Sequence, residues 1–348
     1  MIKAFNITQQ GERHIQKEVV CQDYSGLERV HLEKVDEDII VAAVADGVGS
    51  CKFSQFGSKK AVESCLKCIK FNMNNLNELS DDKILNIIQH GFHFSLSEIS
   101  KLAEKEEIPF LEYDTSLCVA VYVKNTVYYG QAGDSGIVVL YNDGQYEMIT
   151  KRHKGEEANS LYPLRDKIEW EFGKSSKEVA SLVLMTDGVL DFCVDSDAMN
   201  NRVFFPFLED ALTEKDKEEN KQKEEWSEYL AGKSEDFPDI RKDITDDISF
   251  VVVQNTEMLK KIPPVIFDEE TWKEDSAKRK KEIDEFLYAD FYKYKEKSNQ
   301  QSNKKEESED KSKIEENLEK EVDCEEIIQD FVQLTKKVSS LIKNKLSK

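Results

Sequence analysis

The sequence predicts an α+β fold in which amphipathic helices cover an antiparallel sheet. Apolar residues recur at helical spacing over 51–71 and 82–107, which indicates two amphipathic helices. After Pro109 the pattern becomes that of strands, with turns at Lys124-Asn125 and at 142–144. Strands joined by tight turns pair antiparallel, so we expect the two helices to cover one face of such a sheet, and not a doubly wound parallel arrangement.

The other elements follow in chain order. Residues 1–8 resemble a first strand, and a mostly polar stretch over 150–180 is expected at the surface. Two strands are predicted next, one at 168–172 and one that ends at Asp187. Residues 203–230 predict one or two helices joined by a charged, solvated segment, and the last core strand, ISFVVVQ, ends near Asn255.

Composition limits the partners of the chain. Its 348 residues permit one large domain with an appendage, or two domains, and its formal net charge of −21 disfavours nucleic acid or an anionic membrane as the main partner. No run approaches the ~20 apolar residues that span a bilayer, and the start, MIKAFNITQQGERH, lacks an apolar secretory segment. We therefore expect a soluble cytoplasmic protein.

The seven cysteines are expected to be reduced thiols. Only Cys65 and Cys68 form a close pair, and their spacing places both on one face of the first predicted helix. A zinc site needs a second such pair, which the sequence lacks. Helix packing is the favoured interpretation of this pair, with metal or redox use as the alternative.

The composition changes beyond Pro263-Pro264, where Lys and Glu dominate. We predict one domain over 1–258 and a charged linker with a helical extension over 259–348. The last part carries a short heptad-like apolar seam. Three alternatives remain open for this seam: packing on the chain's own domain or a partner, self-association, or no fold on its own. The seam consists of Ile327, Phe331, Leu334, Val338 and Leu341.

Several apolar strands end in an aspartate. Asp46 ends IIVAAVAD, Asp187 ends SLVLMTD, Asp134 follows VYYGQAG, and Asp246 with Asp247 precedes the last strand. Each Asp-Gly alone is also a turn signal. Converging carboxylates repel each other, however, and oxygen ligands select Mg²⁺ or Mn²⁺. Two such ions about 4 Å apart orient a phosphate for hydrolysis.

Other hydrolase signatures are absent from the sequence. There is no GxSxG nucleophile motif, no GxxxxGK[ST] phosphate loop and no HExxH zinc motif. The chain instead carries seven motifs in order: GxxH followed by CQD at 21–23, VADGVGS at 44–50, DTSL at 114–117, GQAGDSG at 130–136, ITKRHKGE at 149–156, LMTDGVLD at 184–191 and TDDISFVVV at 245–253.

With these motifs, residues 8–255 resemble the metal-dependent type 2C serine/threonine protein phosphatases, specifically their bacterial-like branch. The resemblance implies a sandwich of two antiparallel sheets flanked by helix pairs, with 1–258 as the catalytic domain. It also implies a phosphorylated protein substrate, in which a hydroxide that bridges two Mn²⁺ or Mg²⁺ ions attacks phosphoserine or phosphothreonine.

The resemblance further implies a role for each site residue. Asp46 would bridge two ions, with the Gly47 carbonyl completing one of them. Asp187 and Asp246 would hold the second ion, and Asp23 would bind the first ion or order water there. Asp134 would hold a third, weaker ion together with Asp187.

Three positions depart from the family pattern. Val48 stands where eukaryotic members have a histidine proposed as general acid. Many bacterial relatives also lack it, so the resemblance leaves a metal-bound water to protonate the leaving group. Arg13 and His14 are adjacent, and either is a candidate for the arginine that grips the substrate phosphate. Asp247 replaces the usual asparagine, which would either tighten metal binding or face solvent. Two further residues leave alternatives open, since His153 is a surface or substrate-contacting residue and Asp191 a helix cap or a metal ligand.

The leading hypothesis is thus a metal-dependent serine/threonine protein phosphatase. A weak or inactive pseudophosphatase that binds a phosphorylated partner is the alternative, motivated by Val48 and the charged tail. A phosphatase of small metabolites is a third reading that the motifs leave open.

Overall fold

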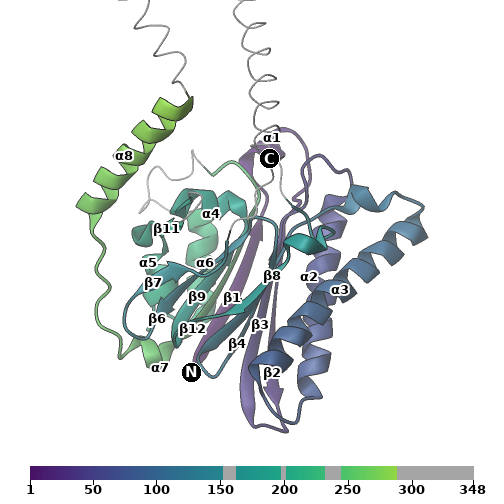
Figure 1. The fold of residues 1–348 in the computed structure, drawn as a ribbon, viewed down its shortest axis with the longest axis horizontal. Coiled ribbons are helices and arrows are strands. Elements are labelled where there is room, and N and C mark those ends of the chain that lie inside the picture. The colour runs from purple at the N-terminus through teal and green to yellow at the C-terminus, as the bar shows by residue number, and fades with distance from the viewer. Residues whose placement is uncertain (152–161, 197–200, 232–243, 288–348) are drawn as a thin grey trace, which may run out of the picture. The chain divides into compact units, whose positions relative to one another are not determined.

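The computed structural model describes residues 1–348 apart from 152–161, 197–200, 232–243 and 288–348 (Figure 1). It contains two compact units, Met1–Phe267 and Asp268–Lys348. The second unit contains helix α8 (Glu269–Leu287). The predicted apolar seam of the tail and His153 lie outside the described residues. The domain boundary after residue 258 stays a prediction.

Two five-stranded antiparallel sheets form the centre of the first unit. In spatial order, the first sheet consists of β1 (Ile2–Gln9), β12 (Ile248–Asn255), β9 (Val179–Met185), β6 (Gly136–Tyr141) and β7 (Tyr146–Met148). The second sheet consists of β2 (Tyr24–Leu32), β3 (Glu37–Ala45), β4 (Leu117–Val123), β5 (Thr126–Ala132) and β8 (Glu171–Lys174). A separate pair is formed by β10 (Val194–Ser196) and β11 (Asn201–Val203).

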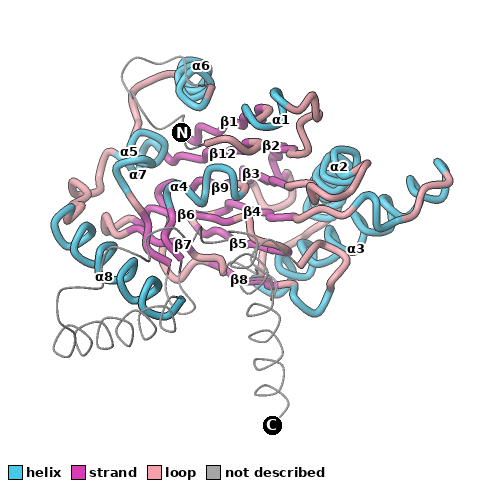
Figure 2. The backbone as a smooth tube through the Cα atoms, turned by 90° about the horizontal axis from the view of Figure 1, so that it is seen from above, coloured by secondary structure: helices cyan, strands magenta, loops and turns pink. Residues whose placement is uncertain are grey.

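Helices cover the outer face of each sheet (Figures 1 and 2). The second sheet is covered by α2 (Ser54–Asn74) and α3 (Asp81–Glu106). The first sheet is covered by α4 (Asp187–Cys193), α5 (Phe205–Thr213) and α6 (Glu219–Leu230). Two short helices, α1 (Glu12–Gln16) and α7 (Thr256–Leu259), adjoin β1 and β12. The predicted α+β sandwich is confirmed.

Strand β3 explains why its sequence is apolar without alternation. Val41 and Ala43 pack against the helices of the second sheet, whereas Ala42 and Val44 pack between the two sheets. Both faces of the strand are therefore buried, and each position needs an apolar side chain. A strand with one solvated face would alternate instead.

The two predicted turns are confirmed, but they lie in different sheets. Lys124 and Asn125 join β4 to β5 in the second sheet and both have positive φ, of 49° and 60°. Gly144, with φ of 82°, lies in the turn between β6 and β7 in the first sheet. The expectation of one continuous antiparallel sheet over these strands is therefore wrong, because the chain changes sheets between β5 and β6.

Helix packing accounts for the close cysteine pair. Cys65 is buried in the core between α2, α3 and the second sheet, and burial raises the pKa of its thiol. A Cβ added to Gly91 of α3 would lie only 2.8 Å from Cys65 Sγ. Gly91 thus lets the two helices approach closely at the thiol, which favours the packing interpretation.

Two local predictions shift. The strand expected at 168–172 begins later, as β8, and Ile168 lies 93% exposed in a short 3-10 helix before it. Much of the predicted charged bridge after α5 belongs to α6, whose buried side includes Trp226 and Tyr229. Among the described residues, no helix has the length and apolarity needed to cross a membrane.

Candidate metal and phosphate site

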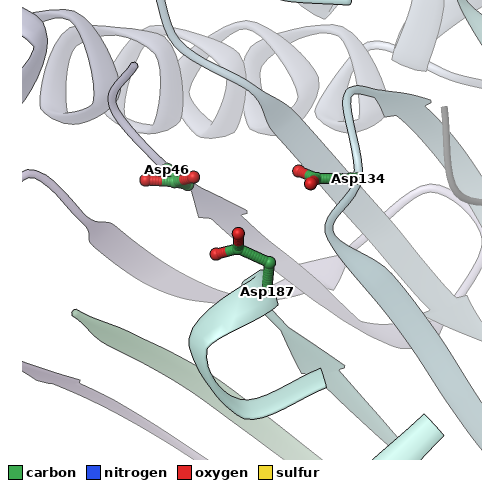
Figure 3. Close-up of side chains that lie close together, drawn as sticks. All are labelled: Asp46, Asp134 and Asp187. Atoms are coloured by element: carbon green, nitrogen blue, oxygen red, sulfur yellow. The ribbon is translucent and has the colours of Figure 1, made fainter. Parts of the chain in front are cut away.

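Three carboxylates lie close together at the ends of strands from both sheets. Asp46 directly follows β3, Asp134 lies between β5 and β6, and Asp187 begins α4 after β9 (Figure 3). One carboxylate oxygen of each lies within 4.8 Å of the others. The second sheet supplies Asp46 and the first sheet leads to Asp187, so the sandwich itself brings these side chains together.

The DTSL motif fixes the backbone of Asp46. The Asp46 N–H donates to Ser116 Oγ at 2.9 Å, and the Asp46 carbonyl accepts from Ser116 N and Thr115 Oγ1, both at 2.8 Å. Three hydrogen bonds therefore hold the residue at the strand end. The motif resemblance assigned no role to these two side chains, because nothing in the sequence links positions about seventy residues apart.

The glycine after each strand-end aspartate is required by close packing. A Cβ on Gly47 would lie 2.8 Å from both the Gln22 carbonyl oxygen and Ser54 Cβ. A Cβ on Gly188 would lie 2.1 Å from the Asp247 carbonyl oxygen. Any larger residue would force backbone apart at the site.

Asp134 lies in a turn that Gln131 supports. The Gln131 Nε2 donates to the carbonyls of Gly133, at 3.2 Å, and Ser135, at 2.6 Å. Gly133 has φ of 102°, a conformation that favours glycine. Asp134 is 6% exposed, so its carboxylate is held in a largely dry turn.

Asp23 adds a fourth acidic group beside this cluster. It is buried and accepts a 2.6 Å hydrogen bond from Thr186 Oγ1. Burial raises the pKa of both Asp23 and Asp46, and repulsion from Asp187 raises each further.

The donor set at this site fits a hard divalent cation. All of its side-chain donors are carboxylate oxygens, the preferred ligands of Mg²⁺ and Mn²⁺. Buried like charges raise one another's pKa unless a cation neutralises them. The raised pKa values of Asp23 and Asp46 are the electrostatic signature of such a site.

Asp246 lies at the start of β12, outside the three-carboxylate group in the described part of the chain. Its Oδ2 accepts from Arg13 Nη2 at 2.6 Å, and its Oδ1 accepts from the Asp247 N–H at 2.9 Å. The side chains of Arg13 and Asp246 are 49% and 38% exposed. Asp246 Cβ would lie 3.5 Å from a Cβ on Gly188, so the residue adjoins the first turn of α4.

His14 and Asp247 form a buried pair next to it. Nδ1 of His14 donates to Asp247 Oδ2 at 2.8 Å, and the two residues are 8% and 3% exposed. The expectation that Asp247 could face solvent is therefore wrong. Arg13 is the more exposed of the two candidates for phosphate binding.

Two further sequence expectations change. Asp191 lies in α4, whose N-cap residue is Thr186, so it does not cap the helix start. Val48 donates its N–H to the Asp114 carbonyl and offers no side-chain proton.

A cavity of about 420 Å³ lies elsewhere, between α5 and α6. Its lining includes Asp210, Glu225 and Trp226 and none of the aspartates described above. Converging carboxylates, and not cavity volume, define the candidate site.

The family model for protein phosphatase 2C matches residues 10–231. The chain belongs to the protein phosphatase 2C family. The matched segment contains Asp23, Asp46, Asp134 and Asp187, and it confirms the family that the seven motifs predicted. Members of this family are metal-dependent serine/threonine phosphatases. A search of curated proteins found no match.

Solved bacterial phosphatases share the fold of this phosphatase 2C chain. A bacterial serine phosphatase is 15% identical, with a TM-score of 0.51, and the match covers 73% of this chain and 98% of that chain. Stp1 from Staphylococcus aureus gives the same identity, TM-score and coverage of this chain, with 95% of its own chain covered. The serine/threonine phosphatase of S. agalactiae is 14% identical, with a TM-score of 0.50, covering 73% and 99%.

The phosphatase 2C chain also contains a site contact that no motif indicated. Arg165 Nε donates to both carboxylate oxygens of Asp114, at 3.0 and 2.8 Å. Leu164 N donates to the Thr115 carbonyl at 2.8 Å. The segment before β8 is thus fastened to the DTSL motif that holds Asp46. A lone arginine in a polar stretch gives no sequence signal for such a contact.

Proposed function

We propose that this chain removes phosphate from phosphoserine and phosphothreonine in phosphorylated proteins, using two Mn²⁺ or Mg²⁺ ions and a weaker third. The observation that carries this proposal is the three-carboxylate group of Asp46, Asp134 and Asp187, with oxygens within 4.8 Å of one another, in a chain of the phosphatase 2C family. Such ions supply an activated water and neutralise the phosphate charge.

Each ligand role follows the family pattern. Asp46 would serve two ions, with the Gly47 carbonyl completing one, and Asp23 would serve the first. Asp187 and Asp246 would hold the second ion, and Asp134 with Asp187 the third. Asp246 differs from the other proposed ligands, because its carboxylate pairs with Arg13 and lies outside the three-carboxylate group.

Arg13 is the proposed phosphate-binding residue. Its guanidinium has five N–H donors, and the structure assigns one nitrogen, Nη2, to Asp246. The remaining donors and the 49% exposure of the side chain leave it able to hold a phosphate in the bidentate manner that guanidinium favours. Since Val48 carries no proton donor, the proton for the leaving serine or threonine oxygen comes from water.

The test compares Asp187 with an aspartate outside the candidate site. Purified full-length protein should hydrolyse a phosphothreonine peptide with Mn²⁺, and EDTA should abolish the activity. Asp187→Asn should lower kcat/KM by roughly a hundredfold or more, since loss of even an outer metal partner has effects of 10–100-fold. Asp143→Asn makes the same chemical change on an exposed carboxylate in the turn between β6 and β7 and should leave activity near wild type.

Two outcomes would count against the proposal. Activity that survives EDTA, or that Asp187→Asn leaves unchanged, would exclude metal-dependent hydrolysis at this site. Calorimetry that shows no Mn²⁺ binding, together with no turnover of any phosphopeptide, would favour the pseudophosphatase, which the clustered carboxylates do not favour. Turnover of small phosphate esters alone would indicate a metabolite phosphatase.

A further inference from the structure

We infer that Asp247 is a positioning residue that ties both ends of segment 11–22 to the start of β12, and thereby places Asp23 and Arg13. This inference rests on the proposed function, because it concerns how two proposed site residues are held. It assigns His14 to the same task and not to phosphate binding.

The Asp247 carboxylate accepts three short hydrogen bonds. Oδ1 accepts from Gly11 N at 2.7 Å, and Oδ2 accepts from His14 Nδ1 at 2.8 Å and from Gln22 N at 2.6 Å. All three donors come from one segment more than 200 positions earlier in the chain. Asp247 is 3% exposed, so these charge-assisted bonds form with little competition from water.

The three donors lie at the two ends of the segment. Gly11 and His14 flank Arg13 at α1, and Gln22 directly precedes Asp23. One carboxylate therefore closes the loop between a proposed phosphate ligand and a proposed metal ligand. Displacing it would free both residues together.

Backbone packing at Gly11 shows how tightly the loop is held. A Cβ on Gly11 would lie 2.2 Å from the Asp246 carbonyl carbon and 2.3 Å from its oxygen. Arg13 N donates to the Thr245 carbonyl at 2.9 Å. The Asp246 carboxylate accepts a hydrogen bond from the Arg13 side chain. The neighbouring carboxylates of Asp247 and Asp246 therefore hold the backbone and the side chain of the same turn.

The residue type at 247 follows from this geometry. A carboxylate accepts hydrogen bonds at both oxygens, whereas an asparagine amide accepts at one and presents N–H groups at the other. Three donors converge here, so asparagine would leave at least one donor facing another donor. Service of Asp247 as a metal ligand would likewise require breaking these bonds.

His14 fits a positioning role better than a phosphate-binding role. It is 8% exposed and Nδ1 is taken by Asp247. Arg13, its neighbour, is about half exposed and points to Asp246. The adjacent pair thus divides the work, with His14 anchoring the turn that presents Arg13.

The main experiment uses Asp247→Asn in the full chain. Hydrogen–deuterium exchange of the metal-free protein should be faster in peptides covering 11–23. Calorimetry should give a Kd for Mn²⁺ about tenfold higher, within the range for outer partners of a metal site. At saturating Mn²⁺ the phosphopeptide KM should rise, whereas simple loss of folded protein would lower kcat alone.

Asp143→Asn is the matched control. This exposed carboxylate also accepts hydrogen bonds, from Gln145 N at 3.0 Å and Lys177 Nζ at 2.6 Å, in the turn between β6 and β7. It should change neither the Mn²⁺ affinity nor exchange at 11–23. Wild-type exchange and Mn²⁺ affinity in Asp247→Asn would overturn the inference.

Two variants of His14 test the inference if Asp247→Asn does not fold. His14→Asn keeps a donor near the Nδ1 position and should retain most of the Mn²⁺ affinity, whereas His14→Leu removes the donor and should weaken it. Equal affinity in both would contradict the positioning role. Inactive wild-type protein would refute the proposed function, yet the exchange and calorimetry results would still decide this inference.

Discussion

The hydroxyl of Thr186 donates a 2.6 Å hydrogen bond to Oδ2 of Asp23. The Thr186 hydroxyl oxygen in turn accepts from Ser249 N at 2.9 Å. Thr186 is fully buried and precedes Asp187, so one hydroxyl joins the N-terminal segment to the ends of β9 and β12. An uncharged hydroxyl thus helps to position the Asp23 carboxyl group beside the three-carboxylate group.

Replacing this hydroxyl should destabilise the protein. Thr186→Val keeps the shape but leaves a buried N–H and a buried carboxyl group unsatisfied, which costs about 1–3 kcal/mol of unfolding free energy. Urea denaturation of the metal-free protein measures the change. The control is Thr213→Val, a half-buried residue whose hydroxyl makes a solvent-exposed hydrogen bond to the Glu209 carbonyl, with an effect within about 0.5 kcal/mol. Equal effects of both substitutions would contradict this account.

Two glycines near the site should differ in their tolerance of a methyl group. Gly188→Ala places a Cβ 2.1 Å from the Asp247 carbonyl oxygen, so the backbone of α4 or β12 must move. We expect a loss of about 1–3 kcal/mol in unfolding free energy and weaker Mn²⁺ binding. In Gly49→Ala the nearest atom, Gln22 Oε1, is 3.8 Å away. Denaturation and calorimetry should find Gly49→Ala close to wild type, and a reversed order would refute the packing argument.

Metal binding should strengthen as the pH rises. Burial raises the pKa of Asp23 and Asp46, so the metal-free fold binds protons that the unfolded chain has already released. Their contribution to stability is present at low pH and is lost as the pH rises through the folded-state pKa values. Mn²⁺ replaces these protons, and its affinity therefore increases with pH.

Denaturation and Mn²⁺ calorimetry over mildly acidic to neutral pH test this prediction. The metal-free protein should lose unfolding free energy towards neutral pH, and Mn²⁺ should restore it. Asp46→Asn removes one carboxyl group of the pair and should flatten the dependence. A Mn²⁺ affinity that does not change with pH would show that no proton is displaced.

Two truncations test where the catalytic unit ends. Leu259 is buried in the core under the first sheet, and the ring of Phe267 packs edge-on against Phe204 with centroids 5.4 Å apart. Ending the chain after Phe267 should keep Mn²⁺-dependent activity on a small phosphate ester. Ending it after Met258 removes both contacts and should lower the melting temperature. A normal melting temperature in the shorter chain would place the boundary at 258.

The chain that ends at Phe267 also tests the role of the tail, by comparison with the full chain. We propose that the apolar seam of the tail mediates self-association or partner binding. Sedimentation of the full chain and of the chain ending at Phe267 distinguishes these cases. A dimer that is lost on truncation would support self-association, and two monomers would exclude it.

Local patterns predicted the strands and their aspartates because burial on both faces leaves a continuous apolar run, as in β3. The glycines after Asp46 and Asp187 are turn signals in the sequence, whereas in the structure close packing is the physical reason for them. The change of sheets around Asp134 could not be predicted, since hairpins look alike in sequence whichever sheet they join. The family pattern supplied the two-sheet arrangement instead.

Contacts between distant positions were the part that the sequence could not reveal. Asp247 was expected to tighten metal binding or to face solvent, and its three donors lie in a segment more than 200 residues earlier. Arg165 and Asp114 are 51 positions apart and lack any paired pattern. Such partners are chosen by the fold, so only coordinates identify them.

The three clustered carboxylates are divided between the two halves of the sandwich. Asp46 directly follows a strand of the second sheet, and Asp187 follows a strand of the first. The distance between the two carboxylates therefore depends on how the sheets pack against each other. Ala42 and Val44 pack in the apolar layer between the sheets and help set that spacing. A change of side-chain volume in this buried layer would therefore alter the distance between Asp46 and Asp187 while every acidic residue stays the same.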